Sequence, residues 1–172
     1  GVVTDSGTIA RDGERVPVCI CLSTENAGFY YDKDEQVWFD GVEFPMALAD
    51  ALTAYRSTSF DDLDGDGHLE FVCGNYWFKR EGSAFAQYRY CTGKVSCRIA
   101  LGDVDGKDDL EIVVCESAAI SEYELSGATL SVFRQGVDIT QPWEEQVLSD
   151  SINDCGALLV GSFTGNRLPD II

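Results

Sequence analysis

The sequence predicts an all-β fold built from repeated four-stranded antiparallel sheets. Two observations support this prediction. Short runs of β-branched and aromatic residues follow one another along the chain and are broken by Gly, Asp and Ser, as expected of strands. An Asp- and Gly-rich segment also recurs at intervals of about 40 to 60 residues, a period that in a β-rich chain is typical of propeller blades.

The repeat is seen in three segments that align without gaps: residues 60–72, 101–113 and 160–172. Asp62, Asp103 and Ser162 hold the same place in this alignment. Residues 1–172 are therefore predicted to form a single β-propeller segment without an interdomain linker. The expected blades are residues 1–60, 61–101 and 102–161, with the start of a further blade at 162–172.

The strands follow from the β-branched and aromatic runs. Expected strands are residues 18–22, 28–31, 37–39, 70–74, 76–79, 86–90, 110–115, 129–133 and 145–148. Residues 45–52 fit either two turns of helix or an outer strand with its loop. About three four-stranded antiparallel blades result, which cannot close a ring, because propellers use typically 4–8 blades. We therefore expect a partial propeller, from a ring of about seven blades, that belongs to a longer protein or closes with other subunits.

The segment Asp62–Glu70, here called loop one, has the composition of a calcium loop. Asp62, Asp64 and Asp66 stand at alternate positions, and Glu70 follows at position 9. Calcium prefers 6–8 oxygen ligands, and the carbonyl of His68 would add one to the carboxylates. Gly65 and Gly67 permit the tight curl of the backbone. A solvated turn that binds no ion is the alternative.

An EF-hand loop is the main rival among calcium sites. It requires an acid at position 12 and a helix on each side. Position 12 of this segment is Cys73, and the Tyr76-Trp77-Phe78 run that follows is strand-like. A nine-residue loop that enters a strand fits the sequence better.

Loop one resembles the calcium loop of FG-GAP/VCBS repeats, which occur in integrin α-chain propellers and in many secreted bacterial and fungal propellers. Residues 74–78 and 143–148 also resemble recurring strand pieces of VCBS-type propellers. The resemblance implies that each loop holds one Ca²⁺ and joins the outer strand of one blade to the inner strand of the next.

The segment Asp103–Glu111, loop two, keeps three of the acids: Asp103, Asp105 and Glu111. The carbonyl of Asp109 would add a ligand, but Lys107 stands where position 5 should supply an acid. Either this lysine points outward and the metal site is weak, or it replaces the metal by pairing with the acids. Loop two is therefore the weaker second site.

Loop three, Ser162–Asp170, offers Ser162, Thr164, Asn166 and Asp170, with one formal charge. Calcium affinity follows the number of charged ligands. Loop three is therefore expected to persist as a turn that binds calcium very weakly or not at all.

Charge excludes several partners. The chain carries 30 acids and 12 bases, for a formal net charge of −18. Nucleic acid and anionic lipid both require basic surfaces, so neither is an expected partner. No apolar run reaches the length of about 18 residues that a membrane span needs. We expect an extracellular or periplasmic location, where calcium is abundant.

Seven cysteines leave at least one without a partner inside this chain. Cys91 and Cys97 flank a short turn and are the most plausible disulfide, whereas Cys19 and Cys21 share one face of a predicted strand and cannot easily bond each other. A set of buried thiols is the alternative.

The leading hypothesis is a non-catalytic, calcium-binding segment that binds a glycan or an extracellular protein, as in cell adhesion. His68 is the only histidine, so a His-based catalytic triad is absent. One alternative is part of a carbohydrate-active propeller enzyme, such as a polysaccharide lyase or a sugar dehydratase. Another is a structural subunit of a larger extracellular assembly. Six aromatic residues could stack on a sugar, but burial in the core is favoured: Trp38, Phe39, Tyr76, Trp77, Phe78 and Trp143.

Overall fold

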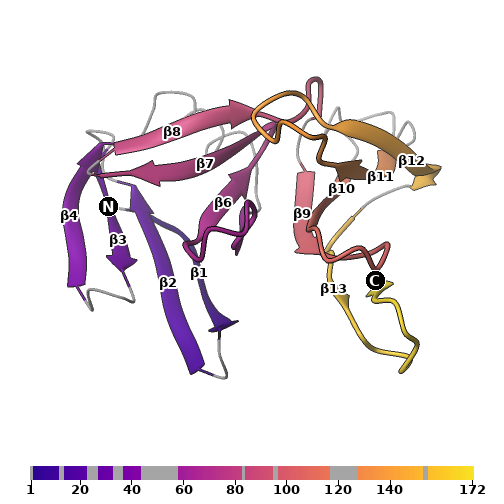
Figure 1. The fold of residues 1–172 in the computed structure, drawn as a ribbon, viewed down its shortest axis with the longest axis horizontal. Coiled ribbons are helices and arrows are strands. Elements are labelled where there is room, and N and C mark those ends of the chain that lie inside the picture. The colour runs from indigo at the N-terminus through magenta and orange to yellow at the C-terminus, as the bar shows by residue number, and fades with distance from the viewer. Residues whose placement is uncertain are drawn as a thin grey trace.

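The computed structural model describes nine segments of the chain, all built from strands and the loops between them (Figure 1). These segments are residues 2–11, 14–22, 27–32, 37–43, 58–82, 84–94, 97–116, 128–152 and 155–172. The segment 45–52, predicted as helix or strand, lies outside them. None of the described residues forms a helix of the length and apolar character that crossing a bilayer requires.

Fourteen strands are described. Their bounds are β1 Val2–Arg11, β2 Glu14–Leu22, β3 Ala27–Asp32, β4 Val37–Glu43, β5 Thr58–Asp61, β6 Glu70–Cys73, β7 Tyr76–Glu81, β8 Ala84–Arg89, β9 Cys97–Gly102, β10 Glu111–Glu116, β11 Ala128–Arg134, β12 Glu144–Ile152, β13 Val160–Gly161 and β14 Asp170–Ile171. All of the strands predicted from the sequence are present. The strands β1, β5, β9, β13 and β14 were not among those predicted.

The strands form three sheets. One has eight strands in the order β1-β2-β3-β4-β8-β7-β6-β5, one has four in the order β12-β11-β10-β9, and β13 pairs with β14. The eight-stranded sheet consists of two four-stranded antiparallel meanders joined by a single parallel pair, Glu43 with Ala84. The predicted all-β, antiparallel architecture is therefore confirmed.

Strand pairing places each acidic loop inside one sheet. Loop one connects β5 to β6, which pair from Thr58 with Cys73 to Asp61 with Glu70. Loop two connects β9 to β10 in the same way, and loop three connects β13 to β14. The implied connection between neighbouring blades is therefore wrong for these loops. Loops one and two each close the hairpin between the first two strands of a four-stranded meander, and loop three closes the hairpin of the two-stranded sheet.

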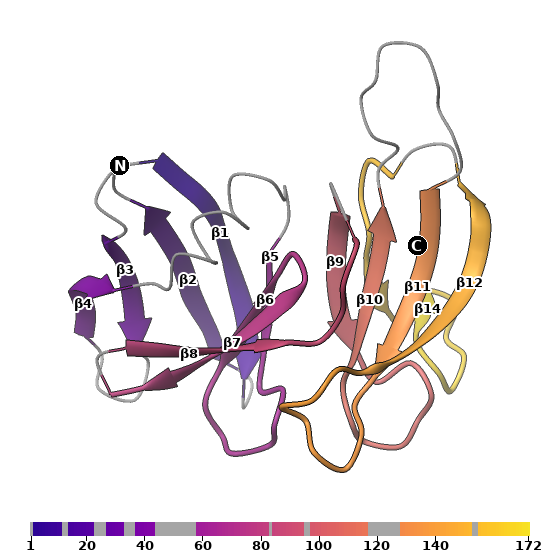
Figure 2. The same cartoon turned by 90° about the horizontal axis from the view of Figure 1, so that it is seen from above.

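A hydrophobic core fills the space between the meander β5–β8 and the sheet β9–β12, which lie side by side in Figure 2. Val72 and Trp77 enter it from the first sheet, and Ile112, Val114 and Phe133 enter it from the second. Each of these five side chains is at most 1 % exposed. Their burial against one another is the main force that stacks the two sheets.

Equivalent faces of the meander β5–β8 and the sheet β9–β12 point in the same direction. The two do not pack with equivalent faces against each other. Val72 of β6 faces the second sheet, whereas its counterpart in the repeat alignment, Val113 of β10, lies on the far face of β10, because Ile112 and Val114 occupy the near face. Val113 is nonetheless fully buried. The meander β5–β8 and the sheet β9–β12 therefore present equivalent faces in one direction.

The predicted disulfide between Cys91 and Cys97 is wrong, because both residues are buried thiols. The Cys91 thiol donates a hydrogen bond to Asn75 Oδ1 at 3.0 Å. Burial raises the pKa of Cys91 to about 12 and also raises the pKa of Cys97. The alternative of buried thiols is confirmed for the described cysteines, which are Cys73, Cys91, Cys97, Cys115 and Cys155.

Lys94, in the segment between β8 and β9, is buried and bonds to side chains of the second sheet. Lys94 is 7 % exposed, and its ammonium donates to Glu145 Oε1 at 2.8 Å, Thr129 Oγ1 at 2.8 Å and Glu116 Oε2 at 3.2 Å. Burial alone would lower the pKa of Lys94, but its hydrogen bond to Glu145 and the charge of Glu116 outweigh this effect and raise the pKa. A buried charge is tolerated here because it is fully paired.

Tyr90 offers a test of this packing. It is fully buried, and its hydroxyl donates to the carbonyl of Gly74 at 2.6 Å. We expect Tyr90→Phe to lower the free energy of unfolding by about 1–2 kcal/mol in urea titrations, because the Gly74 carbonyl loses its donor. Tyr88→Phe is the control, because the Tyr88 hydroxyl makes no hydrogen bond within the described part of the chain. Equal effects of the two substitutions would contradict the assignment.

Candidate metal centre

Loop one brings four carboxylates together. One oxygen from each of Asp62, Asp64, Asp66 and Glu70 lies within 4.8 Å of the others. Two oxygens on opposite sides of a calcium ion lie about 4.6–5.2 Å apart, because each stands 2.3–2.6 Å from the ion. The predicted acids of loop one are thus gathered at a spacing that fits a metal ion. Hard carboxylate oxygens suit Ca²⁺ or Mg²⁺ better than a soft metal.

The backbone of loop one is shaped by its own acids. The N–H of Gly67 donates to Asp62 Oδ2 at 2.9 Å, and the N–H of His68 donates to Asp66 Oδ1 at 2.8 Å. Gly65 has a φ of 74° and Gly67 a φ of 92°, in the left-handed region that favours glycine. The predicted role of the two glycines is therefore confirmed. The His68 carbonyl as a ligand stays a prediction.

Glu70 is the most informative of the four acids. It is only 1 % exposed, and its Oε2 accepts a hydrogen bond from the N–H of Leu63 at 3.0 Å. Its Oε1 and the Oδ1 of Asp62 are both buried and accept no hydrogen bond from the described residues. Buried carboxylate oxygens normally have partners. These two oxygens are therefore suited to bind a cation.

Burial disfavours the charged form of Glu70. It raises the pKa of Glu70 from its ordinary value of 4.5 to about 7, and the negative charge of Asp64 contributes in the same direction. A divalent cation among the four acids would oppose both effects, because it stabilises the ionised carboxylates.

One basic residue reaches this cluster from outside the loop. The ammonium of Lys79, on β7, donates to Asp64 Oδ2 and also to Asp66 Oδ2 at 2.6 Å. The hydrogen bond from Lys79 is the main reason that the pKa of Asp66 is lowered. Partial burial would lower the pKa of Lys79, but its bonds to Asp64 and Asp66 outweigh this and raise it.

Loop two repeats the arrangement with more positive charge. One oxygen from each of Asp103, Asp105 and Glu111 lies within 4.8 Å of the others. Asp105 Oδ2 accepts hydrogen bonds from Lys107 Nζ at 2.7 Å and from Arg134 Nε at 3.3 Å. Together they lower the pKa of Asp105, with the Lys107 bond as the larger cause.

The structure thus combines the two alternatives for Lys107. Its side chain is 71 % exposed, so it lies outside the loop, yet it pairs with Asp105. Glu111 is buried, and burial raises its pKa. Asp105 Oδ1 is buried and accepts no hydrogen bond from the described residues. Loop two therefore retains part of the geometry of loop one at a less negative charge. The Asp109 carbonyl as a ligand stays a prediction.

Loop three uses its acid internally. Asp170 accepts hydrogen bonds from the N–H of Phe163 at 3.0 Å and the N–H of Thr164 at 2.8 Å. The Thr164 hydroxyl also donates to Asp170 at 2.8 Å and accepts from Asn166 Nδ2 at 2.7 Å. These bonds stabilise loop three as a turn through its own side chains.

All three loops share one pattern of hydrogen bonds. The acid at position 9 accepts from the N–H at position 2 in each loop: Leu63 to Glu70, Val104 to Glu111 and Phe163 to Asp170. Position 4 is a glycine with positive φ in each loop, namely Gly65, Gly106 and Gly165. The three segments that align in sequence therefore also share this hydrogen bond and this backbone conformation.

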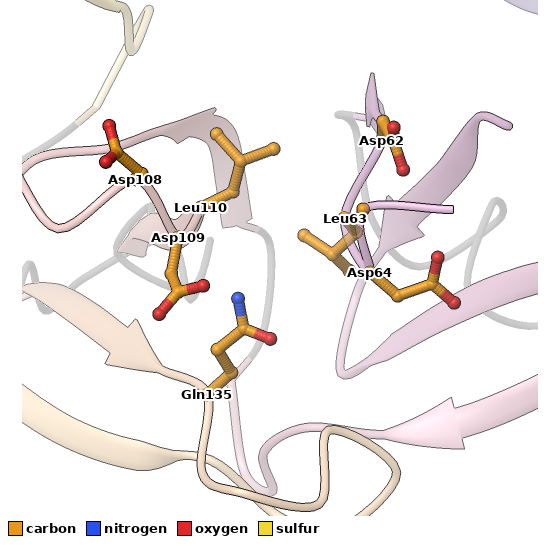
Figure 3. A pocket seen from close by; sticks show the side chains of 8 residues that line it. Asp62, Leu63, Asp64, Asp108, Asp109, Leu110 and Gln135 are labelled. Carbon is orange, nitrogen blue, oxygen red and sulfur yellow. The ribbon is translucent and has the colours of Figure 1, made fainter. Parts of the chain in front are cut away.

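Loops one and two also lie close to each other. Loops one and two lie at the same edge of the stacked sheets (Figure 2) and line a pocket of about 110 Å³. Leu63 and Asp64 lie on one side of this pocket, and Asp109, Leu110 and Gln135 lie on the other (Figure 3).

Gly65 and Asp109, at positions 4 and 7 of their loops, both line this pocket. Between loops two and three, a Cβ added to Gly106 would lie 2.7 Å from Leu168, which are again positions 4 and 7. A Cβ added to Gly65 would meet nothing within 4 Å, so this close contact at Gly106 is not repeated between loops one and two.

Lys79 and Arg134 were missed by the sequence analysis. Lys79 follows Phe78 on β7, and Arg134 follows Phe133 on β11, which are the third strands of the meander β5–β8 and of the sheet β9–β12. Each basic residue donates to the acid at position 3 of its loop. Phe78 pairs with Phe71 and Phe133 pairs with Ile112, so the two basic residues share one register. The sequence signal is a Phe followed by Lys or Arg. The number of residues between the loop and this pair differs between the two repeats, so the alignment of the loops does not reveal it.

The aromatic residues proposed for sugar stacking are mostly internal where the structure describes their side chains, which excludes Trp38 and Phe39. Trp77, Phe78 and Trp143 are buried, which confirms their favoured assignment to the core. Tyr76 is half-buried beside Arg89, whose guanidinium stacks over its ring at 5.1 Å.

Comparisons of the chain with protein-family models, curated proteins and solved structures find no match. The resemblance to FG-GAP/VCBS repeats therefore rests on the residues of the loops and stays a prediction.

The raised pKa of Glu70 predicts how stability changes with pH. Between about pH 4.5 and pH 7 the folded chain holds a proton on Glu70 more tightly than the unfolded chain does, so this residue reduces stability as the pH rises. Glu70→Gln keeps the acceptor for Leu63 without the charge. In chelator, we expect the variant to melt above wild type at pH 8, by about 2–4 °C for each kcal/mol gained, and to lose this advantage at pH 4.

Melting curves in chelator across this pH range measure the difference. A difference that stays constant with pH would contradict the burial of a charged Glu70. Calcium should also stabilise the variant less than wild type at pH 8.

Proposed function

We propose that this chain is a calcium-binding, non-catalytic propeller segment of the FG-GAP/VCBS type, with its principal Ca²⁺ site in loop one. One observation carries the proposal: four carboxylates converge in loop one, and two of their buried oxygens, Asp62 Oδ1 and Glu70 Oε1, have no hydrogen-bond partner among the described residues. A divalent cation would satisfy both oxygens and relieve the repulsion between the acids.

Calcium is favoured over magnesium by the shape of the donor set. Mg²⁺ requires near-ideal octahedral geometry at 2.0–2.1 Å and usually keeps several waters, whereas Ca²⁺ accepts a larger and more flexible set of oxygens. Loop one supplies four carboxylates from a short curled backbone, and the His68 carbonyl would add a fifth ligand. Such a set fits a calcium site that needs few waters.

Propeller architecture is supported by the way in which the sheets repeat. Each of the two meanders β5–β8 and β9–β12 has four antiparallel strands in chain order. Loops one and two line one pocket, and loops two and three come close at Gly106 and Leu168. Successive four-stranded units whose hairpin loops lie next to one another are expected when blades are arranged around an axis.

In this proposal calcium has a structural role. Glu70 links loop one to β6, and Leu63, which donates to Glu70, is itself part of the core between the sheets. An ion at loop one would therefore hold the hairpin β5–β6 rigid against the second sheet. A scaffold of this kind suits the binding of a glycan or an extracellular protein, in surroundings where calcium is abundant.

Asp62→Asn tests the site directly. Asparagine keeps the acceptor for the Gly67 N–H but removes the charge beside the unpartnered oxygen. We expect calcium affinity, measured by calorimetry, to fall at least about tenfold, which corresponds to about 1.4 kcal/mol. Asp150→Asn, at an exposed residue of β12, is the control for the general loss of negative charge. An unchanged affinity of Asp62→Asn would contradict the site.

The number of bound ions tests the difference between the loops. We expect loop one of wild type to bind calcium more tightly than loop two and to account for the one ion detected, because Lys107 and Arg134 both oppose a cation at Asp105. Lys107→Asp supplies the acid at position 5 and removes one positive charge. Calorimetry should then detect a second site, and a stoichiometry that stays at one would show that Lys107 is not what weakens loop two.

A further inference from the structure

We infer that Lys79 is a built-in competitor of calcium that sets the affinity of loop one. This inference rests on the calcium site proposed above and adds a regulatory residue from outside the loop. The Lys79 ammonium holds oxygens of Asp64 and Asp66, two of the four acids that converge in the loop. A calcium ion that takes both acids as ligands must displace this ammonium.

The position of Lys79 is built into the sheet. Lys79 follows Phe78, which pairs with Phe71, so it lies beside the start of β6 where Glu70 enters the loop. Its side chain is 27 % exposed, so it is held largely within the protein rather than extended into solvent. It contacts two acids at once, unlike an isolated surface ion pair, which contributes little.

The second sheet repeats this arrangement. Arg134 stands at the corresponding position of β11, after Phe133, and donates to Asp105, the acid at position 3 of loop two. Two sheets with different connecting segments therefore place a basic residue at one register and direct it to the same acid. The repetition indicates that this basic residue belongs to the site.

Competition follows from the charges. Without calcium, the ammonium reduces the repulsion among four carboxylates and so supports the fold of the loop. With calcium, the same ammonium must leave Asp64 and Asp66 and then stands near a dication, which lowers the affinity. Loop one would therefore fill only where calcium is abundant, and loop two, opposed by both Lys107 and Arg134, would fill less readily.

The test compares two charge-removing variants. Lys79→Met keeps an apolar stem and offers no oxygen to a metal. Arg89→Met, on the neighbouring strand β8, removes an equal charge from the opposite face, because Arg89 pairs with Tyr76. By calcium calorimetry, we expect Lys79→Met to bind about tenfold more tightly than wild type and Arg89→Met to change affinity by less than about twofold.

Melting in chelator supplies a second readout. We expect Lys79→Met to melt below wild type without calcium and to gain more stability when calcium is added, because both effects follow from the loss of one competing cation. If the variant is unfolded in chelator, the calcium concentration that refolds it reports its affinity instead.

The outcomes separate the two claims. Tight binding by Lys79→Met alone supports the inference. Equal affinities of wild type, Lys79→Met and Arg89→Met would overturn it and leave the calcium site in place. No calcium binding by any of the three would overturn the proposed function and the inference together.

Discussion

The repulsion among the acids of loop one is the constraint on which the account of this structure depends. Asp62, Asp64 and Asp66 stand at alternate positions of a tight turn, and the buried Glu70 closes it. Two of their oxygens accept no hydrogen bond from the described residues. Such an arrangement is costly unless positive charge is supplied, because burial disfavours a charged carboxylate. Lys79 supplies part of that charge, and a divalent cation would supply the rest.

The same turn is tied to the hydrophobic core. The N–H of Leu63 donates to Glu70 while the Leu63 side chain packs with Val72 and Trp77 between the sheets. Electrostatics at the loop and packing between the sheets are therefore coupled through a single residue. This coupling explains how a bound ion could stabilise more than its own loop. The other two loops retain the hydrogen-bond pattern with fewer acids, so the turn itself does not require an ion.

Much of this organisation was predictable from the sequence. The period of the Asp- and Gly-rich segments and the strands β6, β7, β8, β10, β11 and β12 followed from local patterns, as did the acids of loops one and two. The strands β5 and β9, which lead into the loops, were missed because they contain few β-branched or aromatic residues. Lys79 and Arg134 were missed because strand pairing, not sequence distance, brings them to the acids. The thiols of Cys91 and Cys97 show that proximity in sequence does not decide a disulfide.

The central claim is that loop one is a cation site that uses the unpartnered oxygens of Asp62 and Glu70. A crystal structure grown with calcium, or with terbium located by its anomalous scattering, tests it most directly. The account predicts an ion within about 2.3–2.6 Å of Asp62 Oδ1 and Glu70 Oε1, with the Lys79 ammonium moved away from Asp64 and Asp66. Loop one without an ion, and with Lys79 still bound to both acids at millimolar calcium, would contradict it.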